Sequence, residues 1–202
     1  MNPQVTPIES LLSRTSLAGS FMRAPAPNEE ELQMILGAAQ RASDHDRLRP
    51  WRFYVVRPEH YEAFYDRLAE AATRVQGDPE RYERNREKYR LVARAPLMIV
   101  AAAKIDTKAK VAPIEQAFAA AGATQLILNA AHALGYAAFL FSGAGVFDLP
   151  FKASLGLSAE DHLIGFICIG TPNGPGKPGP SAKESIAAGI ASTVKQWMPS
   201  EG

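Results

Sequence analysis

The chain has 202 residues, of which 47% are hydrophobic and 21% are charged, and its formal net charge is +1. This composition is typical of a globular protein, and the length is sufficient for one domain with a sizeable core. A net charge so near zero gives no electrostatic basis for binding nucleic acid or an anionic membrane, so neither is expected as a partner.

Two helices are predicted before residue 41, and the second leads into a polar loop. Ile8, Leu11 and Leu12 have the spacing of one helical face, which indicates a short first helix. Asn28 can cap a second helix, because Glu31 follows three residues later as its capping-box partner. This second helix delivers the polar residues from position 41 onward to the loop at its C-terminal end.

The segment 41–56 combines a polar loop with an apolar strand and is the strongest indication of a ligand site. The loop is dense in cationic and hydrogen-bonding side chains: Arg41, Asp44, His45, Arg47 and Arg49. Arginine binds phosphate through a bidentate fork, and Trp51 beside the strand Phe53–Val56 offers a flat apolar wall. These residues predict a site for an anionic, planar ligand, although a busy surface loop would account for them equally well on its own.

The middle of the chain is predicted to hold a helix, a turn and a strongly charged second helix. The apolar residues of Tyr61–Ala72 have helical spacing, and Gly77 begins a turn. Residues 80–94 form a charged helix whose narrow apolar stripe contains Tyr82 and Tyr89. Because such a helix packs weakly, we expect it to move as a lid and to line a pocket with one of these tyrosines.

A long, nearly uncharged stretch lies beyond the predicted strand 97–101 and the polar segment that follows this strand. It comprises a helix over Ile114–Leu134, capped by Gly135, and a strand over Tyr136–Phe141. No Asp, Glu, Lys or Arg occurs from residue 117 to 147, but polar side chains and a change of period argue against a membrane span. A helix that is apolar nearly all round must be covered on every side, so a partner subunit is expected against it.

The C-terminal part of the chain completes an alternation of helices and short strands. A short helix starts at Asp148 and ends near Gly156, Leu163–Ile169 is a strand, and Gly170–Pro180 is too rich in proline and glycine for a regular element. The tail beyond it can hold a helix that Trp197 docks on another surface. This order fits an α+β fold or a mixed α/β sandwich, and G-x-G-x-x-G and P-loop patterns are absent.

The cysteine content and the N-terminal sequence both favour the cytoplasm. Cys168 is the only cysteine and lies in an apolar run, which indicates a buried core thiol rather than a nucleophile. A single thiol forms no internal disulfide, and no signal peptide is visible, so a reducing compartment is predicted.

Few side chains are candidates for catalysis. The four histidines lack metal-ligand spacing, so no metal site is predicted. Glu115 is either a catalytic carboxylate or, more often, an acid that favours a helix N-terminus. His132 is expected to be a core or interface side chain. We therefore expect a cofactor to carry the chemistry and no residue to be catalytic in itself.

A series of short motifs runs through the chain in a recognisable order. These are Leu11-Leu12-Ser13-Arg14-Thr15-Ser16, Pro25-Ala26-Pro27, Arg41-Ala42-Ser43-Asp44-His45, Pro50-Trp51-Arg52-Phe53, Ala95-Pro96-Leu97, Glu115-Gln116, Ser142-Gly143, Gly165-Phe166 and Gly170-Thr171-Pro172. In this order and spacing they resemble the nitroreductase family of FMN-dependent oxidoreductases, and particularly its small YdjA-like branch.

The resemblance implies an α+β fold with a central mixed or antiparallel sheet flanked by helices, and a homodimer with the long helix at its interface. Residues 1–202 would form a single domain with its core over about 8–172 and a C-terminal extension over 173–202. FMN would bind between the subunits. The residues matched to flavin or phosphate positions are Arg14, Thr15, Ser16, Arg41, His45, Ser142 and Gly143.

The same resemblance implies an activity. NADH or NADPH would act as reductant, and electrons would pass by a ping-pong route through the flavin to a nitroaromatic, a quinone or a similar electron-poor acceptor. Protein groups would orient and polarise the reactants rather than react themselves.

The chain also departs from the family pattern. Thr15 and Ala18 stand where the family usually has arginines, and Leu140-Phe141 replaces a Trp-Arg pair before Ser142. Five cations are candidates to replace the missing charges: Arg23, Arg47, Arg49, Lys177 and Lys183. These departures define an alternative hypothesis, in which a nitroreductase-fold dimer has lost redox turnover and acts as a flavin-binding or other ligand-binding protein.

Overall fold

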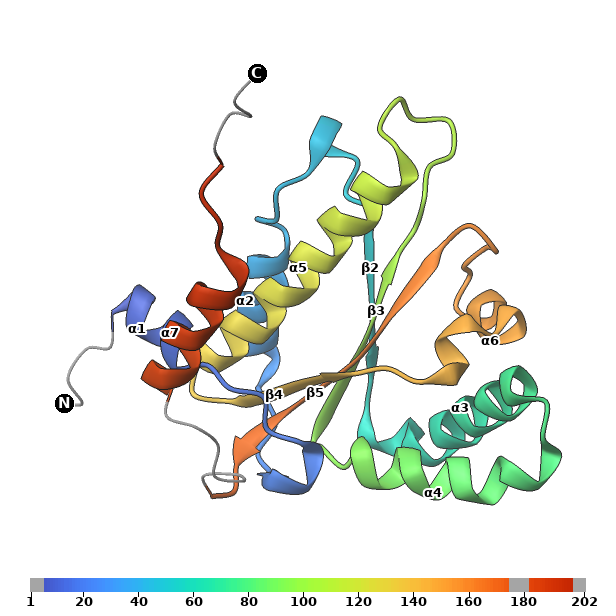
Figure 1. Ribbon diagram of the computed structural model, residues 1–202. Coiled ribbons are helices and arrows are strands. Elements are labelled where there is room, and N and C mark those ends of the chain that lie inside the picture. Colours follow the sequence, from blue (N-terminus) through green and yellow to red (C-terminus); the bar gives the residue numbers. More distant parts are fainter. Residues whose placement is uncertain (1–5, 175–181, 198–202) are drawn as a thin grey trace.

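An antiparallel sheet of five strands lies at the centre of the fold, and helices cover both of its faces (Figure 1). The computed structural model describes residues 6–174 and 182–197. Strand β3 (Leu97–Ala103) lies between β2 (Trp51–Val56) and β5 (His162–Pro172), while β4 (Ala137–Phe141) and the two-residue β1 (Met22–Arg23) also pair with β5. The predicted α+β class is confirmed.

Strand β3 is buried along its whole length, because it has a neighbour on each edge and helices on each face. Alternate side chains therefore enter two separate cores. Met98 and Val100 point to one, and Leu97 and Ile99 point to the other. An almost continuous apolar run is the pattern expected of such a central strand.

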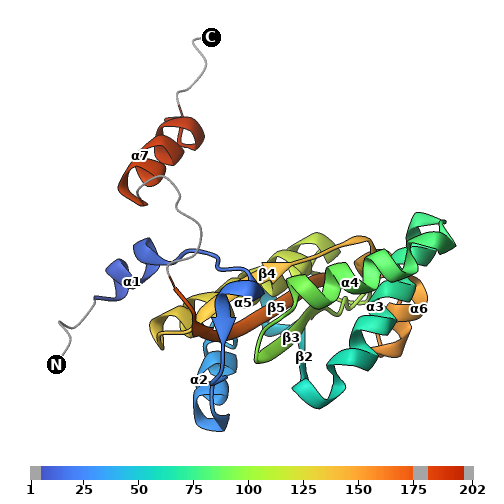
Figure 2. The ribbon, with the colours of Figure 1, turned by 90° about the horizontal axis from the view of Figure 1, so that it is seen from below.

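Helices α2 (Glu29–Ala39) and α5 (Pro113–Ala133) cover one face of the sheet (Figures 1 and 2). The predicted capping box of α2 is present: the Asn28 side chain accepts from the Glu31 N–H at 2.9 Å, and Glu31 accepts from the Asn28 N–H at 2.9 Å. Helix α5 ends where Gly135 adopts a φ of 88°, as the sequence predicted. One side of α5, which includes Ile114 and Phe118, remains exposed outside this core.

Helices α3 (Tyr61–Gln76), α4 (Tyr82–Val92) and α6 (Leu149–Ser154) cover the opposite face. Phe166 of β5 is fully buried at the centre of this core, and its ring contacts Phe64 at a centroid distance of 5.9 Å. Cys168 lies in the same core, and burial raises the pKa of its thiol to about 12. The prediction of a structural rather than a nucleophilic cysteine is confirmed.

Helix α4 is anchored to α3 more firmly than its narrow apolar stripe predicts. Arg86 forms ion pairs with Asp66 and, at 2.9 Å, with Glu62. Asn85 is buried and donates to α3, and the Tyr89 ring is buried in the core. The expectation of weak packing is wrong, because ion pairs between two helices leave no trace in the apolar pattern of either one.

Two helices lie at the periphery of the fold. Helix α1 (Pro7–Ser13) contacts α5, and α7 (Ala182–Thr193) is the helix expected in the tail. Trp197 is 85% exposed, so it does not dock on the described part of its own chain. The remaining elements are short 3-10 helices: η1 (Gly19–Phe21), η2 (His45–Arg47), η3 (Pro58–His60), η4 (Pro79–Arg81) and η5 (Ala144–Phe147). Among the described helices, none combines the length and hydropathy needed to cross a membrane.

Candidate functional site

The segment carrying Arg14, Thr15 and Ser16 runs beside the edge of the sheet. It leaves α1 in an extended conformation, and the Leu17 N–H then donates to the Ala138 carbonyl of β4 at 3.4 Å. Thr15 and Ser16 are exposed, and Arg14 is half-buried. The motif therefore lies at the start of β4, with Thr15 and Ser16 accessible from solvent.

The guanidinium of Arg14 is the clearest indication of a ligand in this region. Its Nη1 atom is buried and finds no hydrogen-bond partner within residues 6–174 and 182–197. A buried donor on a charged group is costly unless it is paired. An anion is the natural partner for a planar cationic fork, so the position suits a phosphate.

Ser142 and Gly143 follow directly after the last residue of β4. Ser142 is exposed, whereas Gly143 packs against Tyr89, and a Cβ at this position would lie 2.7 Å from the Tyr89 hydroxyl. Ser142 lies four positions beyond Ala138, a distance of about 13 Å along a strand. The two predicted motifs thus lie at the two ends of one strand edge, which is an arrangement that suits an elongated ligand.

The structure corrects the expectation that Tyr89 or Tyr82 lines an open pocket. Tyr89 is 3% exposed and supports the Gly143 backbone from behind. The Tyr82 hydroxyl donates a hydrogen bond to the Asp66 carboxylate at 3.3 Å. Both tyrosines are therefore part of the packing between α4 and its neighbours.

Arg41 and His45 lie elsewhere, beside the N-terminal end of α5. His45 Nδ1 is 2.9 Å from the carboxylate of Glu115, which lies in the first turn of α5. The Glu115 hydrogen bond raises the pKa of His45, and the Asp46 charge adds to this effect. Arg41 is exposed and lines, with His45, a cavity of about 570 Å³ against α5.

The backbone of this loop is held in an uncommon conformation. Asp46, Arg47 and Arg49 have φ values of 60°, 57° and 48°, in the left-handed region that non-glycine residues rarely occupy. The Asp44 carboxylate accepts the Arg49 N–H at 2.6 Å and holds the turn in place. Because such strain is concentrated at binding sites, the observed dihedrals support a role for the loop in ligand contact.

Trp51 does not provide the apolar wall that was expected for a ligand. It is 5% exposed in the core between the sheet and α5, and its Nε1–H donates to the Gln40 side chain at 3.1 Å. A buried tryptophan commonly finds such a partner for its single donor. Trp51 therefore fixes the loop relative to the end of α2 without reaching the surface.

The two groups of predicted residues lie near opposite ends of α5 in one chain (Figure 1). His45 contacts Glu115 in the first turn, and Ser13, next to Arg14, contacts His132 in the last turn. Glu115 and His132 are about 25 Å apart along the helix axis. One small ligand cannot contact both groups within a single chain.

A continuous side of α5 connects the two groups and is exposed over most of its length. Ile114 and Phe118 are 56% and 65% exposed, which is high for large apolar residues. The side continues at helical spacing through Gly122, Gln125, Leu126 and Asn129. Large exposed apolar side chains commonly mark a protein interface, and the partner subunit expected from the sequence stays a prediction.

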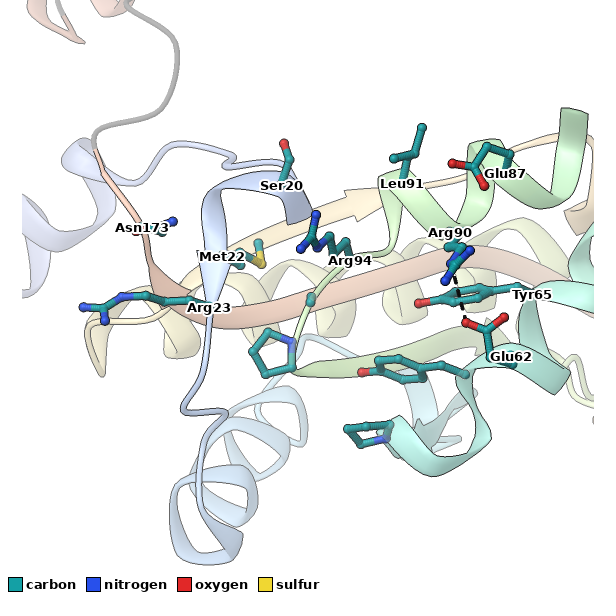
Figure 3. A pocket seen from close by; sticks show the side chains of 14 residues that line it. Ser20, Met22, Arg23, Glu62, Tyr65, Glu87, Arg90, Leu91, Arg94 and Asn173 are labelled. Atoms are coloured by element: carbon teal, nitrogen blue, oxygen red, sulfur yellow. Dashed lines mark ion pairs between the residues drawn. The ribbon is translucent and has the colours of Figure 1, made fainter.

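The sequence did not reveal an open cleft of about 960 Å³ between α4 and the start of α3 (Figure 3). Figure 3 shows Arg90 beside Glu62, with which it forms an ion pair at 3.6 Å. The Tyr61 hydroxyl, also in the lining, is buried without a partner in the described residues. Arg94, interpreted from sequence as a surface cation, belongs to the same lining. No local sequence pattern could predict a cleft formed by side chains from such distant segments.

The structure places some of the candidate replacement cations. Arg47 and Arg49 belong to the loop near Glu115, and Arg23 lies on β1, where it pairs with Thr171 at the end of β5. Lys177 lies outside the described residues, and the Lys183 side chain is likewise not described. No cluster of three potential metal-binding side chains occurs in the described ranges.

Comparison with known proteins identifies the family. The sequence profile of the nitroreductase family matches residues 11–171. The Escherichia coli K12 protein named "Putative NAD(P)H nitroreductase YdjA" is 34% identical over 165 residues, covering 82% of this chain and 87% of the relative. A Haemophilus influenzae protein named "Putative NAD(P)H nitroreductase" is 34% identical over 161 residues, covering 79% and 86%. The chain belongs to the nitroreductase family.

Solved structures confirm the fold. A nitroreductase-like protein from Bacillus cereus has a TM-score of 0.70 at 20% identity, with 92% of this chain and 96% of that chain covered. A Bacteroides fragilis nitroreductase with bound FMN has a TM-score of 0.69 at 18% identity, with 95% and 98% covered. The nitroreductase fold predicted from the motifs is therefore established.

Proposed function

We propose that this chain is an FMN-dependent NAD(P)H oxidoreductase that transfers electrons by a ping-pong route to a nitroaromatic, a quinone or a similar acceptor. The observation that carries the proposal is the Arg14 Nη1 atom at one end of the β4 edge, which is buried and has no partner among the described residues, with Ser142 and Gly143 at the other end. The names of the Escherichia coli and Haemophilus influenzae relatives support the nicotinamide reductant, and the Bacteroides fragilis nitroreductase with bound FMN supports FMN.

The residues along β4 fit the two ends of FMN. Arg14 would bind the phosphate through its free donor, and the exposed Thr15 and Ser16 would add neutral contacts. Ser142 and Gly143 would lie against the ring, where the buried Tyr89 fixes the backbone position. FMN, when bound, would supply the two-electron chemistry that the side chains themselves lack.

The site is completed in our proposal by a second copy of the chain. If two α5 helices pack antiparallel about a twofold axis, the first turn of one lies beside the last turn of the other. Arg41 and His45 of one copy then approach Arg14 and Ser16 of the other, across the distance that separates them in one chain. The exposed side of α5 would be buried in this homodimer.

Phe118 provides a test of this dimer. Phe118→Ala is expected to weaken dimerisation by about tenfold or more, because a large apolar side chain at the centre of an interface contributes about 2 kcal/mol. Sedimentation velocity over a range of protein concentrations would measure the effect. The matched control is Phe147→Ala, which removes an equally large side chain, 74% exposed, from η5 rather than from α5. An equal effect of both substitutions would argue against an interface along α5.

The proposed function is tested by the visible spectrum of the purified protein. We expect added FMN to bind stoichiometrically and its absorption to bleach on addition of NADH or NADPH, with recovery when a quinone is added. The alternative, a dimer that has lost redox turnover and binds flavin or another ligand, predicts either bound FMN that neither nucleotide bleaches or no uptake of FMN. A protein that takes up no FMN would contradict the proposed oxidoreductase and favour this alternative.

A further inference from the structure

His132 lies in the last turn of α5 and faces the segment that carries Arg14. Its Nε2 atom is 3.1 Å from the Ser13 hydroxyl, and Arg14 is the next residue along the chain. The Ser13 hydroxyl donates its only proton to the Ser10 carbonyl at 3.2 Å, so its oxygen accepts a hydrogen bond from the imidazole. The hydrogen-bond network therefore assigns the ring proton to Nε2 and leaves Nδ1 to take up a second one.

Opposing influences act on the charge of this imidazole. Burial lowers the pKa of His132, and the positive charge of Arg14 lowers it further. The C-terminal end of a helix favours a cation and opposes both effects. Among the described residues, the other elements around the ring contribute no titratable side chain to its cavity: α1 presents Ser10 and Ser13, and α2 presents Ala38. Burial and the Arg14 charge therefore both favour the neutral form of the ring in the free protein.

A phosphate bound by Arg14 would change this balance. It offsets the guanidinium charge and brings additional negative charge toward the ring. An opposite charge within about 4–6 Å favours the charged form of a titratable group by roughly 1–3 pKa units. In the proposed dimer, Arg41 and the His45–Glu115 pair of the second copy lie at the same end of α5, so Arg41 adds positive charge and the Glu115 carboxylate is held by His45.

We propose that His132 is a second cation of the phosphate-binding end of the FMN site, and that it takes up a proton as the phosphate binds. It would thereby replace one of the arginines whose positions are taken by Thr15 and Ala18. This inference rests on the proposed function, since it requires that FMN binds beside Arg14. It assigns a role to a histidine that the sequence indicated only as a core or interface residue.

The test compares FMN with riboflavin, which has the same ring and no phosphate. Both are titrated into the full-length protein by flavin fluorescence, from about pH 6.5 to about pH 8.5, where the phosphate is mainly dianionic. The affinity ratio of FMN to riboflavin should be highest at low pH. This ratio should fall by up to about tenfold per pH unit as the pH rises from the His132 pKa of the free protein to the His132 pKa of the FMN complex.

Two variants assign this slope to a residue. His132→Gln keeps a donor for the Ser13 hydroxyl and should make the ratio independent of pH. His45→Gln is the matched control, because it removes the other histidine near the site, and it should retain the slope. A slope unchanged in His132→Gln would overturn the inference.

A measurement on the unaltered protein makes the test independent of how the variants fold. Calorimetric titration in buffers of different ionisation enthalpy should show net proton uptake with FMN near pH 7.5 and none with riboflavin. FMN binding without proton uptake would overturn the role of His132 and leave the proposed function standing. Absence of FMN binding would overturn both.

Discussion

Replacing Arg14 by alanine is expected to weaken FMN binding by about 10- to 100-fold, because a hydrogen bond to a charged group contributes about 1.5–3 kcal/mol. Its Nη1 atom has no partner among the described residues, so the substitution leaves no described group newly unpaired through that donor. The melting temperature and the dimer should therefore be nearly unchanged. Riboflavin affinity should also change little, since riboflavin lacks the phosphate.

Fluorescence titration of both flavins with three variants gives the comparison. Arg14→Lys keeps the charge but not the planar fork, and we expect an intermediate loss of FMN affinity. Arg81→Ala is the control, because Arg81 is an exposed cation paired only locally, with Asp78 at 2.8 Å. Unchanged FMN affinity in Arg14→Ala would remove the assignment of the phosphate site. An equal loss for riboflavin would indicate a general disturbance instead.

Gly165→Ala is expected to destabilise the protein by about 3 kcal/mol, through backbone strain and a steric clash. Gly165 has a φ of 154°, and a Cβ at this position would lie 2.5 Å from the Phe141 carbonyl oxygen. Since that atom belongs to the backbone of β4, no rotation of a flexible side chain can relieve the contact. The strand must move, and Ser142 and Gly143 must move with it.

This substitution should therefore reduce stability and flavin affinity together. Urea unfolding measures the first, and FMN titration of the remaining folded protein measures the second. Gly37→Ala is the matched control, because Gly37 lies in α2 with open space around it. The variant protein should be up to about 1 kcal/mol more stable than the wild type. Wild-type stability of Gly165→Ala would show that the close contact between β4 and β5 is not needed.

The sequence predicted best where the determinants are local. The capping box of Asn28 and Glu31 and the glycine that ends α5 depend on a few neighbouring residues, and both are present. The order of the family motifs was also sufficient to predict the fold. Strand β1 was missed, since two residues are too short to show a period.

The errors arose where distant segments decide the outcome. Trp51 was expected at the surface, but Gln40 and the α5 core bury it. Helix α4 was expected to pack weakly, although Arg86 pairs with acids of α3. The sequence likewise could not show that Glu115, 70 residues away, bonds His45.

The candidate site itself was predicted as residue types rather than as a geometry. The motifs named Arg14 and His45 as positions that contact the phosphate or the flavin, and no pattern indicated that the two residues lie near opposite ends of α5. That separation follows from the contacts of Ser13 with His132 and of His45 with Glu115. It is the reason why the proposed site needs two chains.

Co-expression of two differently tagged variants, Arg14→Ala and Arg41→Ala, tests the shared site most directly. Each variant alone should have only weak FMN sites. In a mixed dimer, one site would receive both substitutions and the other would be fully native, so about one quarter of all sites should regain tight binding after statistical mixing. Purified mixed dimers should bind one FMN tightly per pair of chains. Mixed dimers without a tight site would contradict a site built from Arg14 of one chain and Arg41 of the other.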